Sequence, residues 1–347
     1  MARALVNFNT FRQELEKKIY EELISDGANP ADAKCEAKDK AEKKTHEAWL
    51  KLRKSSIGGS DSGAVVGMNQ YSSQITLYAD KKGLSKEIVT NEAMRLGTDL
   101  EAYVAERFCE QEGKKVRNDS TMYADDEYDF ITANVDRRIV GENAGLECKT
   151  MGSFNGYNLE AGEIPSHYYC QCMHYCMVMG FDRMYLAILV LQRGLYVIKI
   201  ERDEDFIKRL RREEIHFWVT YVQKNIIPAP DGSDASLETL KQLYPEPTKN
   251  SEIAVPGLDS MIRDYKAVSE MAKDYEQRKK SLQALICSKL GDNEVGIGDS
   301  YGCSWKEQSK ASGYDMEKLK EDYPFIDIDK YKKVSKFRVF RTRNLSK

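Results

Sequence analysis

The sequence lacks any uninterrupted apolar run of about 18 residues, the length that a membrane-spanning helix requires. It therefore predicts no transmembrane helix and no membrane partner. The first residues, MARALVNFNTFRQELEKK, also lack the apolar segment of a secretory signal, so we expect the protein to remain in the cytoplasm. The sequence shows no internal repeat and no low-complexity tract.

Only eight of the 347 residues are cysteines, which does not suggest a disulfide scaffold in a chain of this length and fits a reducing compartment. The densest group is Cys170, Cys172 and Cys176, with His167 and His174 interleaved. Zinc ligands usually lie two residues apart on a tight turn, whereas this group lies in an apolar helical pattern. We interpret the cysteines as small side chains that pack within a helix, and a role beyond packing is the open alternative.

An excess of basic residues is also lacking. The chain has 53 basic and 56 acidic residues, and its net charge of −3 does not by itself indicate a nucleic-acid partner. Residues 331–347 differ because they contain no acidic residue. Such a segment can follow phosphates by releasing counterions, or it can be a solubilising terminus. Its basic residues are Lys332, Lys333, Lys336, Arg338, Arg341, Arg343 and Lys347.

Composition predicts a sizeable core, because 41% of the residues are hydrophobic and 31% are charged. Pro228, Pro230 and Gly232 mark a boundary along the chain. We divide the sequence into an N-terminal helical extension (1–44), a core (45–227) and a C-terminal extension (228–347). The expected fold class is α/β (α+β), with a central mixed sheet flanked by helices.

Hydrophobic periodicity and turn residues predict the elements of this fold. Helices are expected over most of 1–54 with a break at Pro30, from an N-cap at Ser60 or Asp61 through Val66, and over 91–112, 165–179, 203–224 and 257–290. Strands are expected over 130–135, 137–140, 146–149, 184–191 and 195–200, and again within 295–347, where residues 336–341 alternate.

The strongest chemical signal lies in the expected hairpin. Asp136 follows one strand, and Glu147 and Lys149 lie on the return strand. Residues two apart in a strand point to the same face, so Glu147 and Lys149 project together while Cys148 faces the opposite way. The hairpin can bring Asp136 beside them.

Two carboxylates and a lysine on one face suit metal-assisted hydrolysis of a phosphodiester. Hard oxygen ligands favour magnesium, which keeps most of its waters and also takes phosphate oxygens. The backbone carbonyl of Cys148 can supply a further ligand. Lys149 can orient or deprotonate the attacking water if nearby positive charge lowers its pKa. The alternative is an exposed ion pair on a hairpin, which contributes little to stability.

Two further polar residues fall on apolar helical patterns. Glu101 lies at the edge of the face formed by Leu100, Val104 and Phe108, and an inward carboxylate is costly unless it is paired or binds a metal. Gln171 lies in the next core helix and can hold the water or the scissile phosphate. Both support a metal-dependent nuclease site.

A separate segment is typical of an anion site. Basic residues run into Gly58-Gly59 and the expected helix start at Ser60 or Asp61. Free backbone N–H groups at a helix N-terminus bind anions, Arg53 can form a fork of hydrogen bonds to a terminal phosphate, and Ser60 can add a hydroxyl. An ordinary N-capped helix is the alternative.

Together these residues resemble a known family. The motifs occur in the order seen in YqaJ-type viral recombinases, which are relatives of lambda exonuclease within the PD-(D/E)xK nuclease superfamily. The resemblance covers roughly residues 45–225, although Val135 stands where the superfamily has a proline. The motifs are the run from Trp49 to Asp61, Arg95 to Glu101, Asn134-Val135-Asp136, Leu146-Glu147-Cys148-Lys149 and Tyr168-Tyr169-Cys170-Gln171.

The resemblance implies a restriction-endonuclease-like core and an ATP-independent, processive 5′→3′ exonuclease on double-stranded DNA. It further implies a 3′ single-stranded tail for a phage single-strand annealing protein, a ring-shaped homotrimer, and a phage or prophage gene in a bacterial host. Longer YqaJ-type proteins have a similar C-terminal region.

The family also implies a role for each residue. Asp136 and Glu147 would ligate Mg²⁺, with Mn²⁺ as substitute, and Lys149 would activate the water. Glu101 would hold a second metal or its waters, and Gln171 would position the water or the lysine. Arg53 and Ser60 would grip the 5′ phosphate.

Two alternatives remain open on the sequence. One is a structure-specific or restriction-like endonuclease of the same superfamily, which would cut closed circular DNA. The other is a non-catalytic DNA-binding protein. An iron–sulfur nuclease of the RecB type is disfavoured, because the cysteines do not flank the core in the required way.

The basic final segment gives a first testable prediction. Truncation after Asp329 should weaken DNA binding most at low salt, because the lost lysines and arginines would otherwise release counterions from phosphates. Binding of labelled duplex DNA across a salt series measures this. Unchanged affinity at every salt concentration would identify the segment as a solubilising terminus.

Overall fold

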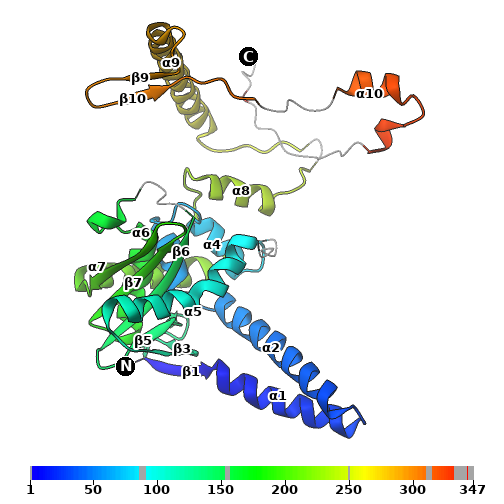
Figure 1. The fold of residues 1–347 in the computed structure, drawn as a ribbon, viewed down its shortest axis with the longest axis vertical. Helices are drawn as coiled ribbons and strands as arrows, with labels where there is room; N and C mark the ends of the chain where they lie inside the picture. The colour runs from blue at the N-terminus through cyan, green and yellow to red at the C-terminus, as the bar shows by residue number, and fades with distance from the viewer. Residues whose placement is uncertain are drawn as a thin grey trace. The chain divides into compact units, whose positions relative to one another are not determined.

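The computed structural model describes residues 2–85, 91–152, 157–248, 251–309, 315–331 and 342. The chain forms two compact units, residues 1–244 and 245–347. Figure 1 shows their elements. The boundary between the units lies later in the chain than the one that Pro228 and Pro230 suggest, because a helix after these prolines belongs to the first unit.

The first unit contains a central five-stranded mixed sheet, as expected. Its order is β2-β5-β6-β7-β8, and β6 and β7 are parallel while the other neighbours are antiparallel. The strands are β2 (Val116–Asn118), β5 (Arg137–Ile139), β6 (Ala144–Met151), β7 (Arg183–Val190) and β8 (Gly194–Glu201). The predicted hairpin is confirmed as β5–β6, with Arg137 opposite Leu146.

One helix covers each face of this sheet. Helix α5 (Glu92–Glu112) packs Val104 and Phe108 against Leu146 and its neighbours. Helix α6 (Ser166–Met179) packs Met173 and other apolar side chains against the opposite face. Because side chains alternate along a strand, β6 sends Leu146 and Cys148 towards α5 and leaves the other face for its polar residues.

Both helices have the ends that the sequence predicts. Asn91 caps α5 by accepting a hydrogen bond from the backbone of Met94. Gly113 ends the helix with φ of 64°, a conformation that glycine adopts without steric cost. Pro165 immediately precedes α6, and Gly180 follows it.

The N-terminal region is less helical than expected. Helices α1 (Phe8–Ser25) and α2 (Pro30–Lys54) are confirmed, and they pack through Ile19, Ala37 and Ala41. The expectation of helix is wrong for β1 (Arg3–Asn7). This strand pairs with β3 (Thr121–Ala124), so the start of the chain belongs to a second sheet of order β1-β3-β4.

The expected strand over 130–135 is mostly wrong. Only β4 (Thr132–Ala133) is a strand, and it pairs with β3 for two residues. Ile57 inserts beside it instead: its N–H donates to the Phe130 carbonyl at 2.6 Å, and the N–H of Thr132 donates to the Ile57 carbonyl at 2.8 Å. A segment distant in sequence therefore takes the hydrogen bonds that a longer strand would use.

Shorter helices surround this core. The sequence did not predict α4 (Gln74–Lys81) and α8 (Asp234–Leu243), whereas α7 (Glu204–His216) is confirmed and continues as a π-helix over Phe217–Gln223. Helix α3 (Gly59–Val65) starts earlier than expected. Its N-cap is Gly58, not Ser60 or Asp61, and Asp61 accepts a hydrogen bond from the Gly58 N–H at 3.0 Å.

The second unit contains the predicted long helix, α9 (Leu258–Leu290), and a hairpin of β9 (Val295–Ile297) and β10 (Gly302–Ser304). The expectation of strands over the rest of the unit is wrong for α10 (Met316–Asp322). The alternating segment 336–341 lies outside the described residues. None of the helices that the structure describes is long and apolar enough to cross a membrane.

Packing of α5 on the sheet gives a stability prediction. Phe108→Ala should lower the free energy of unfolding by about 3–5 kcal/mol, because Phe108 is fully buried and leaves a cavity. Tyr103→Ala, which removes a half-exposed ring from the same helix, should change it by less than about 0.5 kcal/mol. Urea unfolding of both variants tests this, and equal effects would show that α5 is not held through its inner face.

Candidate active site

The β5–β6 hairpin brings the three predicted residues together. Asp136 immediately precedes β5, and its Oδ2 accepts a hydrogen bond from the backbone N–H of Cys148 at 2.8 Å. Glu147 and Lys149 project from β6 on the same side, with 2.5 Å between Lys149 Nζ and Glu147 Oε1. The alternation predicted from the sequence is therefore present, and the Cys148 side chain packs on the α5 side.

Gln171 completes the surroundings of Glu147 from α6. Its side-chain amide donates to Glu147 Oε1 at 2.6 Å and also contacts the Tyr175 hydroxyl at 3.0 Å. Tyr175 is buried, and its ring packs so close to Gly59 that a Cβ there would lie 2.6 Å from a ring carbon. Tyr175 was not predicted from the sequence, although it lies one helical turn after Gln171 and therefore on the same face of the helix.

The two carboxylates are crowded, and Glu147 is buried. Burial, together with the charges of Glu147 and Glu101, raises the pKa of Asp136 well above its usual range. Burial also raises the pKa of Glu147, and the neighbouring Lys149 only partly offsets it. Two ionised carboxylates this close together are unfavourable unless a cation binds between or beside them.

Glu147 has one oxygen to spare for such a cation. Its Oε1 accepts from Lys149 and Gln171, whereas Oε2 is buried and has no hydrogen-bond partner. Across the described part of the chain, no three His, Cys, Asp or Glu side chains come together as a full ligand set. A cation here would take its remaining ligands from water, backbone or substrate, which is how magnesium usually binds.

Glu101 approaches the same site from α5 but has a partner. One Arg137 nitrogen, Nη1, donates to Glu101 Oε1 at 2.7 Å and to the Asp136 backbone carbonyl at 2.7 Å. The charge of Glu101 contributes to the raised pKa values of Asp136 and Glu147, so it lies within electrostatic range of both. Arg137 is therefore the counter-ion of Glu101 in the structure.

The surroundings of Lys149 differ from the sequence-based expectation. A lowered pKa was expected from nearby positive charge. Burial does favour the neutral amine, but the charges of Glu147 and Asp136 outweigh it and raise the pKa of Lys149. In these surroundings Lys149 is an ammonium group, which donates hydrogen bonds and does not accept protons.

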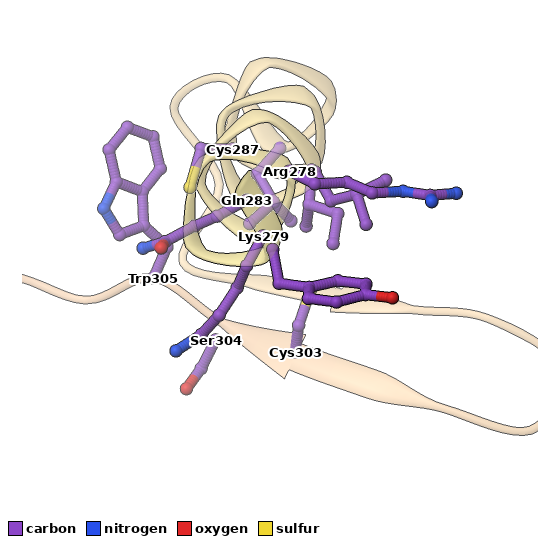
Figure 2. Close-up of a pocket in the computed structure, with 11 residues that line it drawn as sticks. Arg278, Lys279, Gln283, Cys287, Cys303, Ser304 and Trp305 are labelled. Carbon is purple, nitrogen blue, oxygen red and sulfur yellow. The ribbon is translucent and has the colours of Figure 1, made fainter. Parts of the chain in front are cut away.

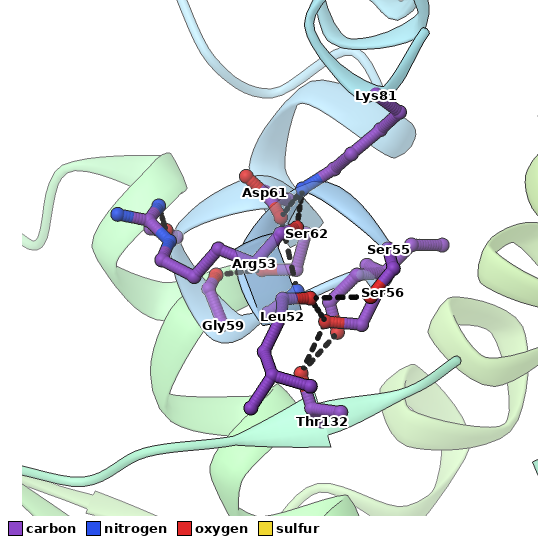
Figure 3. A network of polar contacts seen from close by, with 12 residues as sticks. Leu52, Arg53, Ser55, Ser56, Gly59, Asp61, Ser62, Lys81 and Thr132 are labelled. Atoms are coloured by element: carbon purple, nitrogen blue, oxygen red, sulfur yellow. Dashed lines mark hydrogen bonds and ion pairs between the residues drawn. The ribbon is translucent and has the colours of Figure 1, made fainter. Parts of the chain in front are cut away.

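The predicted phosphate-binding residues also meet. Arg53, at the end of α2, donates from Nη2 to Ser60 Oγ at 2.8 Å and lies over the Trp49 ring at 4.8 Å. Lys81 holds this region together, and Figure 3 shows it reaching towards Asp61. Its Nζ lies 2.6 Å from Asp61 Oδ2 and donates to the Arg53 carbonyl at 2.8 Å.

A buried pair that was not predicted from the sequence links α6 to the strand before Asp136. His174 Nδ1 lies 2.8 Å from Glu214 Oε1, and Nε2 lies 2.9 Å from the Thr132 carbonyl, to which it must donate. Both side chains are fully buried. Burial lowers the pKa of His174, but Glu214 outweighs this effect and raises it. The apolar helix around His174 gave no sign of its partner 40 residues away.

The cysteines of α6 are packed in the interior. Cys170, Cys172 and Cys176 are buried and free, and Cys172 and Cys176 belong to the core between α6 and the sheet. Burial is the main reason that the pKa values of their thiols are raised.

Comparison with known proteins identifies the family of this chain. The family model of the YqaJ-like viral recombinase domain matches residues 48–182. A protein of Bacillus subtilis strain 168, "Uncharacterized protein YqaJ", is 35% identical over 306 residues, which is 87% of this chain and 95% of that protein. The chain belongs to the family of YqaJ-like viral recombinases.

The YqaJ-like domain contains every predicted site residue, since all of them lie between residues 48 and 182. The resemblance drawn from the motifs is confirmed. Membership of this family, together with the carboxylate and lysine geometry, places the chain among the DNA nucleases.

Two solved structures align with about half of this chain. An alkaline exonuclease from Laribacter hongkongensis, LHK-Exo, is 19% identical and covers 50% of this chain and 91% of its own, with a TM-score of 0.42. A phage related exonuclease from Haemophilus somnus 129PT is 12% identical, covers 49% of this chain and 95% of its own, and has a TM-score of 0.41.

The crowding of Asp136 and Glu147 predicts that removing one of the two charges stabilises the metal-free protein. In metal-free buffer at pH 7, Asp136→Asn should raise the melting temperature by roughly 2 °C or more, because it removes a charge whose burial is unfavourable. This gain should shrink as the pH falls through the raised pKa of Asp136, where the wild-type carboxyl also becomes neutral. Thermal melts with a chelator present measure it.

Asp125 provides the matched control. It is also buried, but hydrogen bonds from Arg211 and from two backbone N–H groups outweigh burial and lower its pKa. Asp125→Asn should therefore lower the melting temperature at pH 7, and the loss should fade as the pH falls below 3.8. Destabilisation by both substitutions at pH 7 would contradict the view that Asp136 is held at a cost.

Proposed function

We propose that this chain is a magnesium-dependent, ATP-independent exonuclease that degrades double-stranded DNA in the 5′→3′ direction. The observation that carries the proposal is the buried, unpartnered Oε2 of Glu147 beside Asp136, with Lys149 and Gln171 fixed on the other oxygen. This donor set fits one hard divalent cation. Mn²⁺ should substitute for Mg²⁺, because it accepts the same oxygen ligands.

Each residue has a proposed task at this site. Asp136, Glu147 and the Cys148 carbonyl would hold the metal, and Glu101 would hold a second metal or its waters once it leaves Arg137. When bound, the metal stabilises the charge that develops on the scissile phosphate and makes water a better nucleophile. Gln171 keeps Glu147 oriented through its hydrogen bond.

The charge state of Lys149 limits its task. An ammonium group can donate a hydrogen bond to the attacking water or to a phosphate oxygen, and so can orient either one. It can act as a base only after it loses its proton, which a bound divalent cation would favour by repelling the ammonium charge.

The Arg53–Ser60 pair supports a preference for the 5′ end of DNA. A terminal phosphate carries more negative charge and one more free oxygen than a backbone phosphodiester, so a guanidinium binds it more strongly, and the hydroxyl of Ser60 already lies beside Arg53. We propose that these two side chains bind the 5′ phosphate. Digestion from that end leaves a 3′ single-stranded tail, the substrate for a single-strand annealing protein in phage-type recombination.

Three substrates test the proposal: linear duplex DNA with a 5′ phosphate, the same DNA with a 5′ hydroxyl, and a closed circle, each in Mg²⁺, in Mn²⁺ and with a chelator. We expect metal-dependent loss of linear DNA only, fastest with the 5′ phosphate. Cutting of the circle would identify an endonuclease, and cutting of none would identify a DNA-binding protein.

Lysine substitutions test the site itself. Lys149→Ala should lower the rate of DNA loss by about 100-fold or more, because it removes the positive group beside the reacting phosphate. Lys199→Ala removes an exposed lysine that pairs with Glu201 on β8, and it should leave the rate unchanged. Digestion time courses at saturating DNA measure both, and an active Lys149→Ala enzyme would exclude this site.

A further inference from the structure

Helix α9 has almost no buried surface in the structure. It has 33 residues, all of which the structure describes, and Leu290 at its C-terminal end is the one that is buried. Large apolar side chains are nevertheless frequent along it. Leu258, Met261, Tyr265, Val268, Met271, Tyr275, Leu282, Leu285 and Ile286 are between 41% and 66% exposed.

Seven of these nine side chains follow a coiled-coil pattern, and Met271 and Leu285 lie beside it. Steps of three and four residues alternate without a break from Leu258 to Lys289, and we call the ten residues at these steps the α9 seam. A strict seven-residue repeat fits a second helix that winds around the first with a left-handed twist. The α9 seam consists of Leu258, Met261, Tyr265, Val268, Ala272, Tyr275, Lys279, Leu282, Ile286 and Lys289.

We infer that the α9 seam binds the α9 seam of a second copy of this chain, in an antiparallel two-stranded coiled coil. The seam is symmetric about its midpoint: when two copies run in opposite directions, Met261 faces Ile286 of the second copy and Tyr265 faces Leu282. Each seam residue then has a seam partner over the whole helix, and a two-fold axis relates the copies.

Charge and size favour the antiparallel direction over the parallel one. Parallel helices would place Lys279 against Lys279 of the second copy inside the seam, and Lys289 likewise. Antiparallel helices place Lys279 against Val268 and Lys289 against Leu258, so each ammonium can extend to water along an apolar neighbour. The small Ala272 then faces the large Tyr275 twice at the centre, which is the alternation that close packing requires.

The flanking positions agree with this direction. Beside the seam, Arg278 approaches Met271 of the second copy, and Glu276 approaches Ser269. These pairs bring no two like charges together, and like charges across an interface are costly.

The area is sufficient for a stable dimer. The helix is about 50 Å long at 1.5 Å per residue. Seam and flanking positions together include nineteen of its 33 residues. A standard protein interface uses roughly 20–30 residues from each partner, so α9 alone provides nearly all of one.

A groove at the C-terminal end of α9 extends the same surface. It has a volume of about 540 Å³ and lies between α9 and the β9–β10 hairpin (Figure 2). Tyr275, Leu282 and Ile286 line it from the helix, and Cys303 and Trp305 line it from the hairpin. Met261 and Tyr265 of the second copy face Ile286 and Leu282 in the antiparallel register, so their side chains reach this groove.

Substitutions at Val268 test both the pairing and its direction in the full-length protein. Val268→Lys places a lysine against Lys279 of the second copy twice, and it should weaken dimerisation at least about tenfold. Val268→Glu instead forms two ion pairs with Lys279 and should leave the dimer intact. In a parallel dimer the two substitutions would be equally harmful, since each would face itself.

The readout is molar mass by light scattering over a concentration series without metal or DNA, so it does not depend on nuclease activity. Gln277→Lys adds the same charge on the outer face of α9 and should change nothing, while circular dichroism confirms that each variant folds. We expect a dimer for the wild type, Val268→Glu and Gln277→Lys, and a shift to monomer for Val268→Lys. A monomeric wild type, equal loss in both Val268 variants, or a trimer that Val268→Lys leaves intact would each overturn the inference.

Discussion

The enclosure of Asp136 and Glu147 beside one another is the constraint on which the rest of the site depends. Neither carboxylate would remain ionised there without partners, because burial favours the neutral acid. The protein offsets this with donors from three directions: the Cys148 N–H, the Lys149 ammonium and the Gln171 amide. The hairpin, the parallel pairing of β6 with β7 and the packing of α6 are all needed to bring these donors together.

The same constraint explains the neighbouring pairs. Arg137 pairs with Glu101 next to Asp136, and Lys81 pairs with Asp61 close to the Arg53–Ser60 pair. Glu147 also accepts from protein donors, but only through Oε1, and its buried Oε2 has no hydrogen-bond partner. The chain thereby reserves one oxygen, and a metal that binds there meets little competition from the protein itself.

Features set by local geometry could be predicted from the sequence. Glu147 and Lys149 share a face because strand side chains alternate, and α5 ends at Gly113 because glycine tolerates a positive φ. The long apolar periodicities of α6 and α9 were sufficient to place both helices. The candidate site was predictable to the same extent, because its central residues lie on a single hairpin.

Features set by distant contacts could not be predicted. The strand expected over 130–135 is reduced to Thr132–Ala133, because Ile57, 75 residues before Thr132, takes the hydrogen bonds of Phe130 and Thr132. Helix α4 is short, and its Thr76 hydroxyl bonds Thr239 of α8, a contact between segments 163 residues apart. The sign of the Lys149 pKa shift depends likewise on which charges the fold brings near, and the pairing of His174 with Glu214 has no local signature.

Strand β1 has a practical consequence for how the start of this chain is handled. The strand pairs with β3 from Arg3 to Asn7, and Asn7 also bonds Thr121 and caps α1. Removing these few residues would therefore strip β3 of a neighbour and leave a row of unpaired backbone groups, the kind of edge at which proteins aggregate. A short deletion that looks harmless in the sequence would disturb the sheet whose strand β4 leads into Asp136.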